Sequence, residues 1–205
     1  MNAASPRRNH LQEEQRTRTR GLIAHAALKV FSERGYVASS IEQILVAAGV
    51  SRAAFYSHFD GKLAVVMAIA EEFEPAWKPV FRYLADLPNP QLPELMEWAQ
   101  RHLDLHRSNA ETCTLLTQVA TLEEPLYRKV SLQRDALIDM LAERQPAFAA
   151  AKQDADVMLE AQILLLGIDQ TCFHLVRQHV RDPGGRATRI MAEQMLQFMQ
   201  RHESR

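Results

Sequence analysis

The residues best suited to chemistry lie between Ser39 and Lys62, where hydroxyls and single basic side chains stand near predicted helix starts. Ser40 and Lys62 each come where a helix is expected to begin, and free backbone N–H groups there favour an anion such as a phosphate. Arg52 begins another expected helix, where its guanidinium could bond a phosphate or a guanine edge. Phosphate contacts of this kind fix the position of a protein on nucleic acid but do not select a base sequence.

One expected helix, beginning after Ser51, has an outward face that could supply base contacts. On a helical wheel Phe55 and Phe59 point one way, whereas Ala53 and Ser57 point roughly opposite, with Tyr56 beside them. Small outward residues allow a helix to enter the major groove, where hydroxyls reach base edges and alanine methyls reach thymine methyls.

The elements that must hold these residues are three helices. Apolar residues at four-residue spacing predict the first helix over residues 17–34, with Gly35 placed to end it. A capping box formed by Ser39 and Glu42 would begin the second helix, and Gly49 would end it.

The third helix would start at an N-cap, Ser51, and run to about His58. Two short helices joined by a three- or four-residue turn with a glycine form the helix-turn-helix pattern. Helical hairpins of this kind also occur in proteins that never bind DNA, so the bare pattern leaves that alternative open.

The stretch Thr17–Phe73, with GYVASSIEQILVAAGVSRAAFYSHFDGKLAVV at its centre, resembles the TetR family of bacterial transcriptional regulators. The matching landmarks are Phe31, Gly35, Tyr36, Ser39, Ser40, Ile44, the run Ala47-Ala48-Gly49-Val50-Ser51, Phe55-Tyr56-x-His58-Phe59 and Lys62. Leu45 and Leu63 depart from the family's usual residues. The resemblance implies that nine residues fall on positions that commonly contact DNA: Ser39, Ser40, Ser51, Arg52, Ala53, Tyr56, Ser57, His58 and Lys62.

Beyond the helix-turn-helix, the sequence predicts only further helices, with prolines between them. They are expected at about 62–74, 76–87, 91–107, 110–122, 125–145, 154–180 and 187–201, with a break at Pro75 among others. The fold is therefore predicted to be all-α, with an N-terminal three-helix DNA-binding head followed by a helical ligand-binding and dimerisation body. The expected divisions are a flexible arm (1–16), the head (17–61) and the body (62–205).

Composition favours an ordinary globular protein, because 47% of the 205 residues are apolar and 24% are charged. Neither a signal peptide nor an apolar run approaching ~20 residues is seen, so a cytoplasmic protein without membrane contact is expected. Up to Lys62 the chain has nine Lys and Arg against five acids, whereas the remainder has fifteen against twenty. A basic head on an acidic body is what a DNA-binding protein would show, although a charge excess of this size is often only a solvated surface.

Two helices of the expected body carry more apolar residues than one buried face needs, namely residues 154–168 and the last helix. The resemblance implies that the final two helices pair with those of a second copy across a two-fold axis. Candidate interface residues for this homodimer are Ile163, Leu166, Met191, Met195 and Phe198. A monomer with a large core is the alternative.

A small-molecule effector could bind between the middle helices, since such pockets are mainly apolar with few polar groups. The candidate lining residues are Trp77, Phe81, Trp98, His102, Cys113, Tyr127 and Phe173, although for each of them taken singly ordinary core packing is the more common role. His102 and His106 lie one helical turn apart, a spacing that can hold a metal, but no third ligand follows at a readable spacing. The sequence therefore predicts no metal and no cofactor. Asp169 is either a buried polar residue of the pocket or interface or a residue that faces solvent, and the sequence leaves both alternatives open.

These observations predict a sequence-specific transcriptional regulator, and the resemblance favours a repressor. It would leave a near-palindromic double-stranded DNA operator when a small, largely apolar effector binds the body. An enzyme is not expected, because the sequence has no phosphate-binding glycine loop, HExxH or GxSxG motif. The alternative is a helical ligand carrier or interaction protein that has lost DNA binding.

Overall fold

The structure, a computed structural model, describes residues 6–182 and 184–202. Over these residues it consists of ten α-helices and no strand, which confirms the all-α prediction. Its internal contacts divide the chain into two compact units, Met1–Glu72 and Phe73–Arg205. From here on these two units, in place of the predicted ranges 17–61 and 62–205, are called the head and the body. None of the described helices is both long and apolar enough to cross a membrane.

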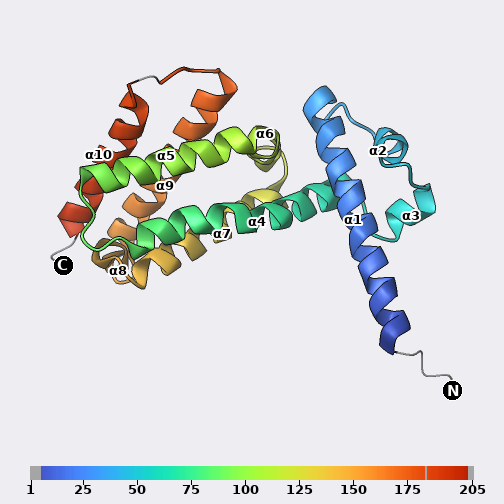
Figure 1. Cartoon of the computed structure of the whole chain (residues 1–205), viewed down its shortest axis with the longest axis horizontal. Helices are drawn as coiled ribbons and strands as arrows, with labels where there is room; N and C mark the ends of the chain where they lie inside the picture. The colour runs from blue at the N-terminus through green and yellow to red at the C-terminus, as the bar shows by residue number, and fades with distance from the viewer. Residues whose placement is uncertain (1–5, 183, 203–205) are drawn as a thin grey trace. The chain divides into compact units, whose positions relative to one another are not determined.

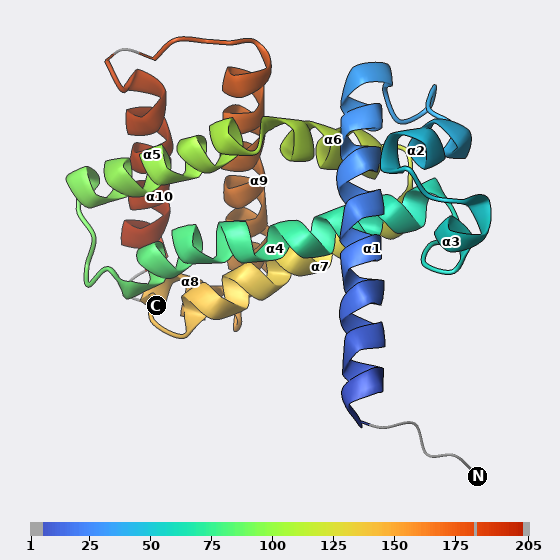
Figure 2. The same ribbon diagram turned by 45° about the vertical axis from the view of Figure 1, so that its right-hand side comes forward.

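The head contains α1 (Pro6–Arg34), α2 (Ile41–Ala48), α3 (Arg52–Tyr56) and the first turns of α4 (Lys62–Asp86). Figures 1 and 2 show α1 as one long rod with the short α2 and α3 beside it. The predicted arm must be corrected, because residues 6–16 continue α1 as helix, while residues 1–5 lie outside the described residues.

The core of the head explains why two short helices hold their places. Ile23 of α1, Ile44 of α2 and Phe55 of α3 are each fully buried, and Phe59 is 2% exposed. The Phe55 and Phe59 ring centroids lie 5.9 Å apart, so the two side chains that face inward from the α3 region pack together. Burying side chains of this size contributes about 1.5–3 kcal/mol each, which is more than the helical propensity of a five-residue helix can supply.

The predicted break at Pro75 is wrong, since α4 continues through both Pro75 and Pro79 to Asp86. A proline fixes φ near the helical value, and what it removes is one N–H and its hydrogen bond. Buried residues later in the same helix, Phe81 and Leu84, anchor it in the body core and keep it helical. The division between head and body falls within α4, after Glu72.

The rest of the described body consists of six further helices, several of which have a proline or an acidic residue at their start. These are α5 (Leu92–Ser108), α6 (Ala110–Ala120), α7 (Glu124–Ala142), α8 (Pro146–Ala151), α9 (Ala155–Arg177) and α10 (Arg186–His202). Pro125 and Pro146 stand in the first turn of α7 and α8, where a missing N–H is harmless. The short α8 is not predicted by the sequence.

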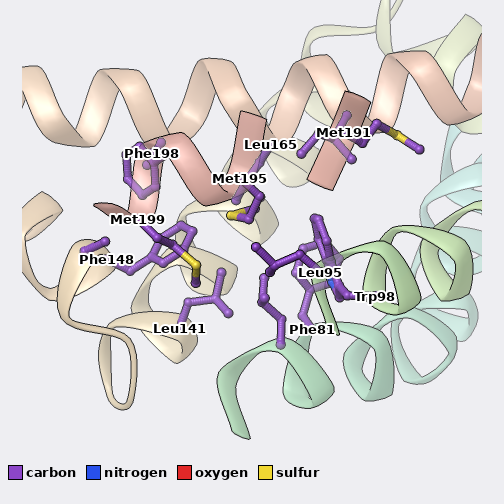
Figure 3. Close-up of a cluster of buried hydrophobic side chains, with 14 of the residues drawn as sticks. Phe81, Leu95, Trp98, Leu141, Phe148, Leu165, Met191, Met195, Phe198 and Met199 are labelled. Carbon is purple, nitrogen blue, oxygen red and sulfur yellow. The ribbon is translucent and has the colours of Figure 1, made fainter. Parts of the chain in front are cut away.

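The body core gathers large side chains from α4, α5 and α7 to α10 (Figure 3). Trp98 and Phe148 are fully buried, with 0% of their surface exposed to solvent. Gln145 closes the end of α4 by donating its side-chain N–H groups to the carbonyl oxygens of Leu84, Ala85 and Leu87 at 2.8–3.1 Å. These contacts satisfy helix-end carbonyls that would otherwise be buried without a donor.

Part of the predicted dimer interface belongs instead to this core. Met191, Met195 and Phe198 of α10 are at most 1% exposed within a single chain, because α10 packs on α5, α8 and α9. Their assignment to an interface is therefore corrected. Ile163 and Leu166 of α9 are 62% and 41% exposed, and both stay candidates for contact with a partner.

Candidate nucleic-acid interface

The outward face of α3 carries the predicted base-contacting side chains. Ser51 caps the helix, its hydroxyl oxygen accepting the Ala54 N–H at 3.1 Å. Ala53, Tyr56 and Ser57 are exposed, whereas the phenylalanines of the same segment are buried. The helix ends at Tyr56, earlier than the predicted His58, and the Ser57 hydroxyl donates to the Ala54 carbonyl at 2.7 Å. The segment therefore divides cleanly into an anchoring face and a free face.

The start of α2 differs from the prediction by one residue. Its capping box is formed by Ser40 and Gln43, not by Ser39 and Glu42. The Ser40 N–H donates to Gln43 Oε1 at 2.9 Å, and the Gln43 N–H donates to the Ser40 hydroxyl oxygen at 3.3 Å. This shift turns the preceding serine inward and leaves Glu42 on the surface.

Ser39 is consequently a structural residue, and its prediction as a DNA contact is corrected. It is 4% exposed, and its hydroxyl donates to the carbonyl oxygen of Gly35 at 2.7 Å. Gly35 has φ +83°, a left-handed conformation that ends α1. The Ser39 hydroxyl therefore holds the loop between α1 and α2 against the end of α1.

Lys62 has contacts within the head that the sequence did not indicate. Its Nζ donates to the carbonyl oxygens of Tyr36 and Ser39, each at 2.7 Å, and lies 4.8 Å from the centre of the Tyr36 ring. The ammonium group therefore ties the start of α4 to the loop before α2. Any phosphate that Lys62 contacts has to share this cation with three carbonyl groups, because that of Val37 also accepts from it at 3.4 Å.

Arg52 is paired with an acid, Glu42, that sequence reasoning did not associate with it. The two exposed side chains form an ion pair between α2 and α3. A backbone hydrogen bond, and then the positive charge of Arg52, lower the pKa of Glu42. The residues are ten positions apart, so only the turn between the helices brings them together.

An open depression of about 420 Å³ brings several predicted residues onto one surface. It is lined by Tyr36, Ser39, Ser40, Ile41, Glu42, Tyr56, Gly61, Lys62 and Leu63. The start of α2, the end of α3 and the start of α4 therefore meet here. The last of the predicted DNA contacts to be placed is His58, which is half-buried. Its carbonyl oxygen accepts a 3.5 Å hydrogen bond from the Arg20 guanidinium, which also stacks over the Phe59 ring.

The predicted effector-pocket residues are only partly brought together. Four of them form a chain of ring contacts at 5.3–6.3 Å, here called the aromatic cluster: Trp77, Phe81, Trp98 and His102. Cys113 on α6 is buried and Phe173 on α9 is half-buried. Tyr127 on α7 is 56% exposed, so its assignment to a pocket wall is corrected.

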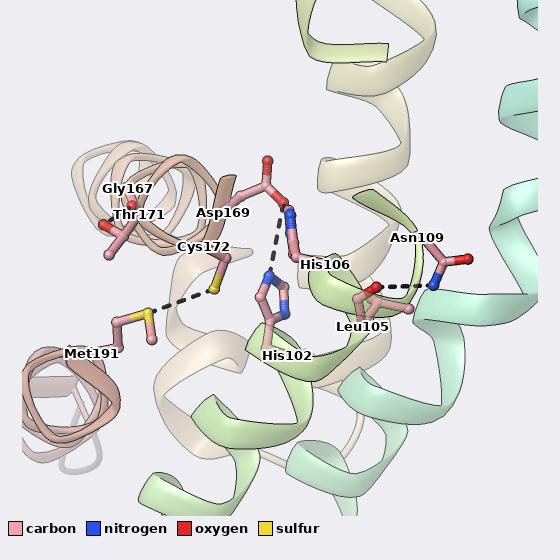
Figure 4. A network of polar contacts seen from close by, with 9 residues as sticks. All are labelled: His102, Leu105, His106, Asn109, Gly167, Asp169, Thr171, Cys172 and Met191. Atoms are coloured by element: carbon pink, nitrogen blue, oxygen red, sulfur yellow. Dashed lines mark hydrogen bonds and ion pairs between the residues drawn. The ribbon is translucent and has the colours of Figure 1, made fainter. Parts of the chain in front are cut away.

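A polar group adjoins the aromatic cluster, where α5 faces α9 (Figure 4). Nε2 of His106 lies 3.1 Å from Oδ1 of Asp169, and Nε2 of His102 lies 3.7 Å from the same oxygen. Burial alone would raise the pKa of Asp169, but the contacts that His102 and His106 make with its carboxylate outweigh burial and hold that pKa well below its usual range. Burial lowers the pKa of His102. Among the described residues, His102, His106 and Cys172 have the donor atoms and spacing to hold a metal.

Comparison with known proteins bears first on the head. Residues 23–69 match the model of the family described as bacterial regulatory proteins, tetR family. The chain is 38% identical over 65 residues to the transcriptional activator FasR of Mycolicibacterium smegmatis, a stretch that spans 32% of this chain and 28% of FasR. It is also 38% identical over 58 residues to the transcriptional repressor DhaR of Mycobacterium sp. strain GP1, spanning 28% of this chain and 29% of DhaR. The chain thus matches less than a third of the length of either relative.

Solved structures extend the likeness of the fold to the body. The fatty acid degradation regulator FadR from Bacillus halodurans superposes with a TM-score of 0.59 at 16% identity, covering 97% of this chain and 96% of FadR. At this identity the likeness concerns the fold alone. The helix-turn-helix residues and the matched family model show that residues 23–69 are similar to the tetR family of bacterial regulatory proteins, and the whole chain shares the all-α fold of a solved regulator.

Proposed function

We propose that this protein is a sequence-specific DNA-binding transcriptional regulator that acts as a repressor. The single observation that carries the proposal is the outward face of α3, where Ala53, Tyr56 and Ser57 are exposed on a helix anchored by Phe55. A helix held rigidly by its buried side, with small and hydroxyl-bearing residues outside, suits insertion in the major groove.

The proposed contacts fall into two groups. Tyr56, Ser57 and Ala53 would meet bases or the sugar–phosphate backbone in the groove, while Ser40 and Arg52 would bind flanking phosphates and fix the register of α3. For Arg52 a phosphate has to displace Glu42, which is possible because both partners are about 60% exposed and an exposed ion pair is weak.

A homodimer and a near-palindromic operator complete the proposal. Leu159, Ile163 and Leu166 lie on one face of α9 and are 41–62% exposed, which suits a partner helix. A two-fold symmetric pair of chains would present two α3 helices to two half-sites. Repression follows from occupancy of the operator, which excludes polymerase.

Release from the operator is proposed to follow binding of a small, largely apolar effector in the body. The aromatic cluster supplies apolar ring surface, and His102 supplies a polar group at its end. Effector and operator would then oppose one another through one coupling free energy, so that each weakens the binding of the other.

The test is selection of bound duplexes from a random DNA pool by the purified full chain, at low and at moderate salt. We expect one near-palindromic sequence to be enriched, with affinity that falls steeply as salt rises. Enrichment of no sequence by a folded protein would reject DNA recognition and favour a ligand carrier that retains only the architecture.

Tyr56→Ala provides the residue-level test, and Tyr127→Ala is its matched control. Both tyrosines are exposed, at 45% and 56%, but Tyr127 lies on α7 of the body. Tyr56→Ala should weaken operator binding roughly 5–100-fold, the effect of losing one or two good contacts, and Tyr127→Ala should not. Equal affinity of the two variants would remove α3 from the interface.

A reporter gene placed behind the selected operator tests the sign of regulation. Repression predicts lower reporter output when the chain is expressed, and loss of that effect in Tyr56→Ala. Higher output with the wild-type chain would show an activator.

A further inference from the structure

We propose that the body contains a transition-metal site of the zinc class, formed by His102, His106, Asp169 and Cys172. The inference goes beyond the proposed function and does not depend on DNA binding. It concerns the group that packs between α5 and α9, next to the aromatic cluster (Figure 4).

The donor atoms have the separations that a tetrahedral ion requires. One nitrogen from each histidine and the Cys172 sulfur all lie within 4.8 Å of one another. The two histidine Nε2 atoms lie 3.1 and 3.7 Å from one oxygen of Asp169. Neighbouring ligands around tetrahedral zinc, each at about 2.0–2.3 Å from the ion, are about 3.3–3.6 Å apart. The histidine nitrogens and the Cys172 sulfur would have to approach one another by up to about 1 Å, through side-chain rotation, to reach these separations, while Asp169 already lies at such a distance from both histidines.

The helices present these residues in pairs. His102 and His106 are four residues apart on α5, and Asp169 and Cys172 are three residues apart on α9, so each pair lies one turn apart on one face. Two pairs facing one another across packed helices are the arrangement by which helical proteins build metal centres. The rigidity of both helices fixes the four positions without a ligand.

Burial gives the second, independent indication of a ligand. His102 is 4% exposed and His106 5%, and neither His102 ring nitrogen has a hydrogen-bond partner among the described residues. A buried imidazole without partners is costly, since it gives up hydrogen bonds to water and gains none. A metal ion bound between the two imidazole rings would supply His102 with the missing partner.

Access and charge also fit an ion. The side chain of Asp169 is 44% exposed while the histidines beside it are buried, so the carboxylate forms a route from solvent to the site. With two neutral imidazoles, one carboxylate and one thiolate, the site would neutralise a divalent cation. Cys172 must give up its proton to bind, so each ion bound releases one proton to solvent.

The residue types select the class of metal. Two imidazoles and a thiolate suit zinc or copper better than magnesium or calcium, which prefer oxygen ligands. The thioether of Met191 lies 3.8 Å from the Cys172 sulfur and adds a soft environment on that side. Sequence reasoning missed this site because Asp169 is 63 residues from His106, and no spacing rule spans that separation.

The experiment is a titration of the full chain, freed of metal by a chelator, with Co²⁺ as a spectroscopic probe. We expect one equivalent to give the visible bands of a tetrahedral ion and a near-ultraviolet thiolate-to-cobalt charge-transfer band. Addition of Zn²⁺ should displace the cobalt and bleach both. Wild-type protein that shows neither band at one equivalent would overturn the site.

Cys172→Ser and Cys113→Ser form the matched pair, because both cysteines are buried in the body and only Cys172 is assigned as a ligand. The charge-transfer band should disappear in Cys172→Ser and persist in Cys113→Ser. A band that survives Cys172→Ser would overturn the proposed ligand set.

Asp169→Asn keeps the proposal testable if the cysteine variant fails to fold by circular dichroism. This partly exposed residue can be changed with less effect on packing, and the loss of one ligand should weaken Co²⁺ binding at least tenfold. Unchanged Co²⁺ affinity in Asp169→Asn would exclude the carboxylate as a ligand and overturn the proposed set of four.

Discussion

Serine hydroxyls in the head do two different things, although the sequence presents them alike. Ser39 is buried and donates to the carbonyl that ends α1, whereas Ser57 is exposed and donates only to the Ala54 carbonyl within its own turn. A hydroxyl that satisfies a buried carbonyl contributes to folding, and an exposed one is replaced by water at little cost. Burial, not residue type, decides which serine is free to meet DNA.

Replacing Ser39 by alanine should therefore change mainly the stability of the protein, and replacing Ser57 by alanine should change mainly its binding to DNA. Ser39→Ala should lower the free energy of unfolding by roughly 1–2 kcal/mol because the Gly35 carbonyl loses its donor. Ser57→Ala should change it by less than about 0.5 kcal/mol and should weaken binding to the selected operator by about fivefold, the worth of one hydrogen bond. Urea denaturation and fluorescence anisotropy measure the two quantities, and a reversed order of effects would contradict the assignment.

At the scale of single elements, the sequence specified some boundaries and missed others for identifiable reasons. Gly35 and Gly49 end α1 and α2 as predicted, because left-handed backbone at those positions favours glycine locally. The capping box moved from Ser39 to Ser40 because both serines have a partner three residues on, and burial of Ser39 decided between them. Local rules could not make that choice.

Longer-range packing explains the remaining differences. Pro75 reads as a helix break in isolation, yet α4 continues past it because later residues are anchored in the body core. The Arg52–Glu42 pair and the approach of Asp169 to two histidines join residues that are distant in sequence. No pattern along the chain encodes such pairs. The sequence could therefore predict which residues belong to the candidate site, but not which of them contact one another.

Two glycines test the conformational argument at this scale. Gly49 has φ +65°, whereas Gly21 lies within α1, and a β-carbon would meet no atom within 4 Å at either position. Gly49→Ala should destabilise the head by about 1 kcal/mol through its backbone alone. Gly21→Ala should stabilise it by about 0.5–1 kcal/mol. Thermal melting compares them, and equal melting temperatures would mean that the turn after α2 tolerates a side chain.

For the molecule as a whole, the apolar residues of α9 divide between two surfaces. Ala161, Leu165 and Ile168 are buried in the body, whereas Leu159, Ile163 and Leu166 are exposed on another side of the helix. Solvent-exposed aliphatic residues in a row are commonly covered by a partner. This separation explains how one helix can serve both the core of a chain and the proposed contact between two chains.

Ile163→Lys should disrupt the proposed dimer, and Leu132→Lys is its matched control. Ile163 is 62% exposed on α9, and Leu132 is 67% exposed on α7, outside the proposed interface. A lysine buried at the interface without a partner should raise the dimer dissociation constant on the order of 100-fold. Sedimentation at micromolar concentration should then show monomers for Ile163→Lys and dimers for wild type and Leu132→Lys. A wild-type chain that sediments as a monomer would contradict the dimer.

The division of α3 into an anchored and a free face also bears on how such a protein can change over generations. Substitutions at exposed Ala53 and Ser57 alter the chemical surface offered outward, while buried Phe55 and Phe59 keep the helix in place. Because exposed substitutions typically shift stability by no more than about 0.5 kcal/mol, a duplicated gene could explore many such surfaces without losing a foldable product. Engineering of a new target preference should begin at the same positions.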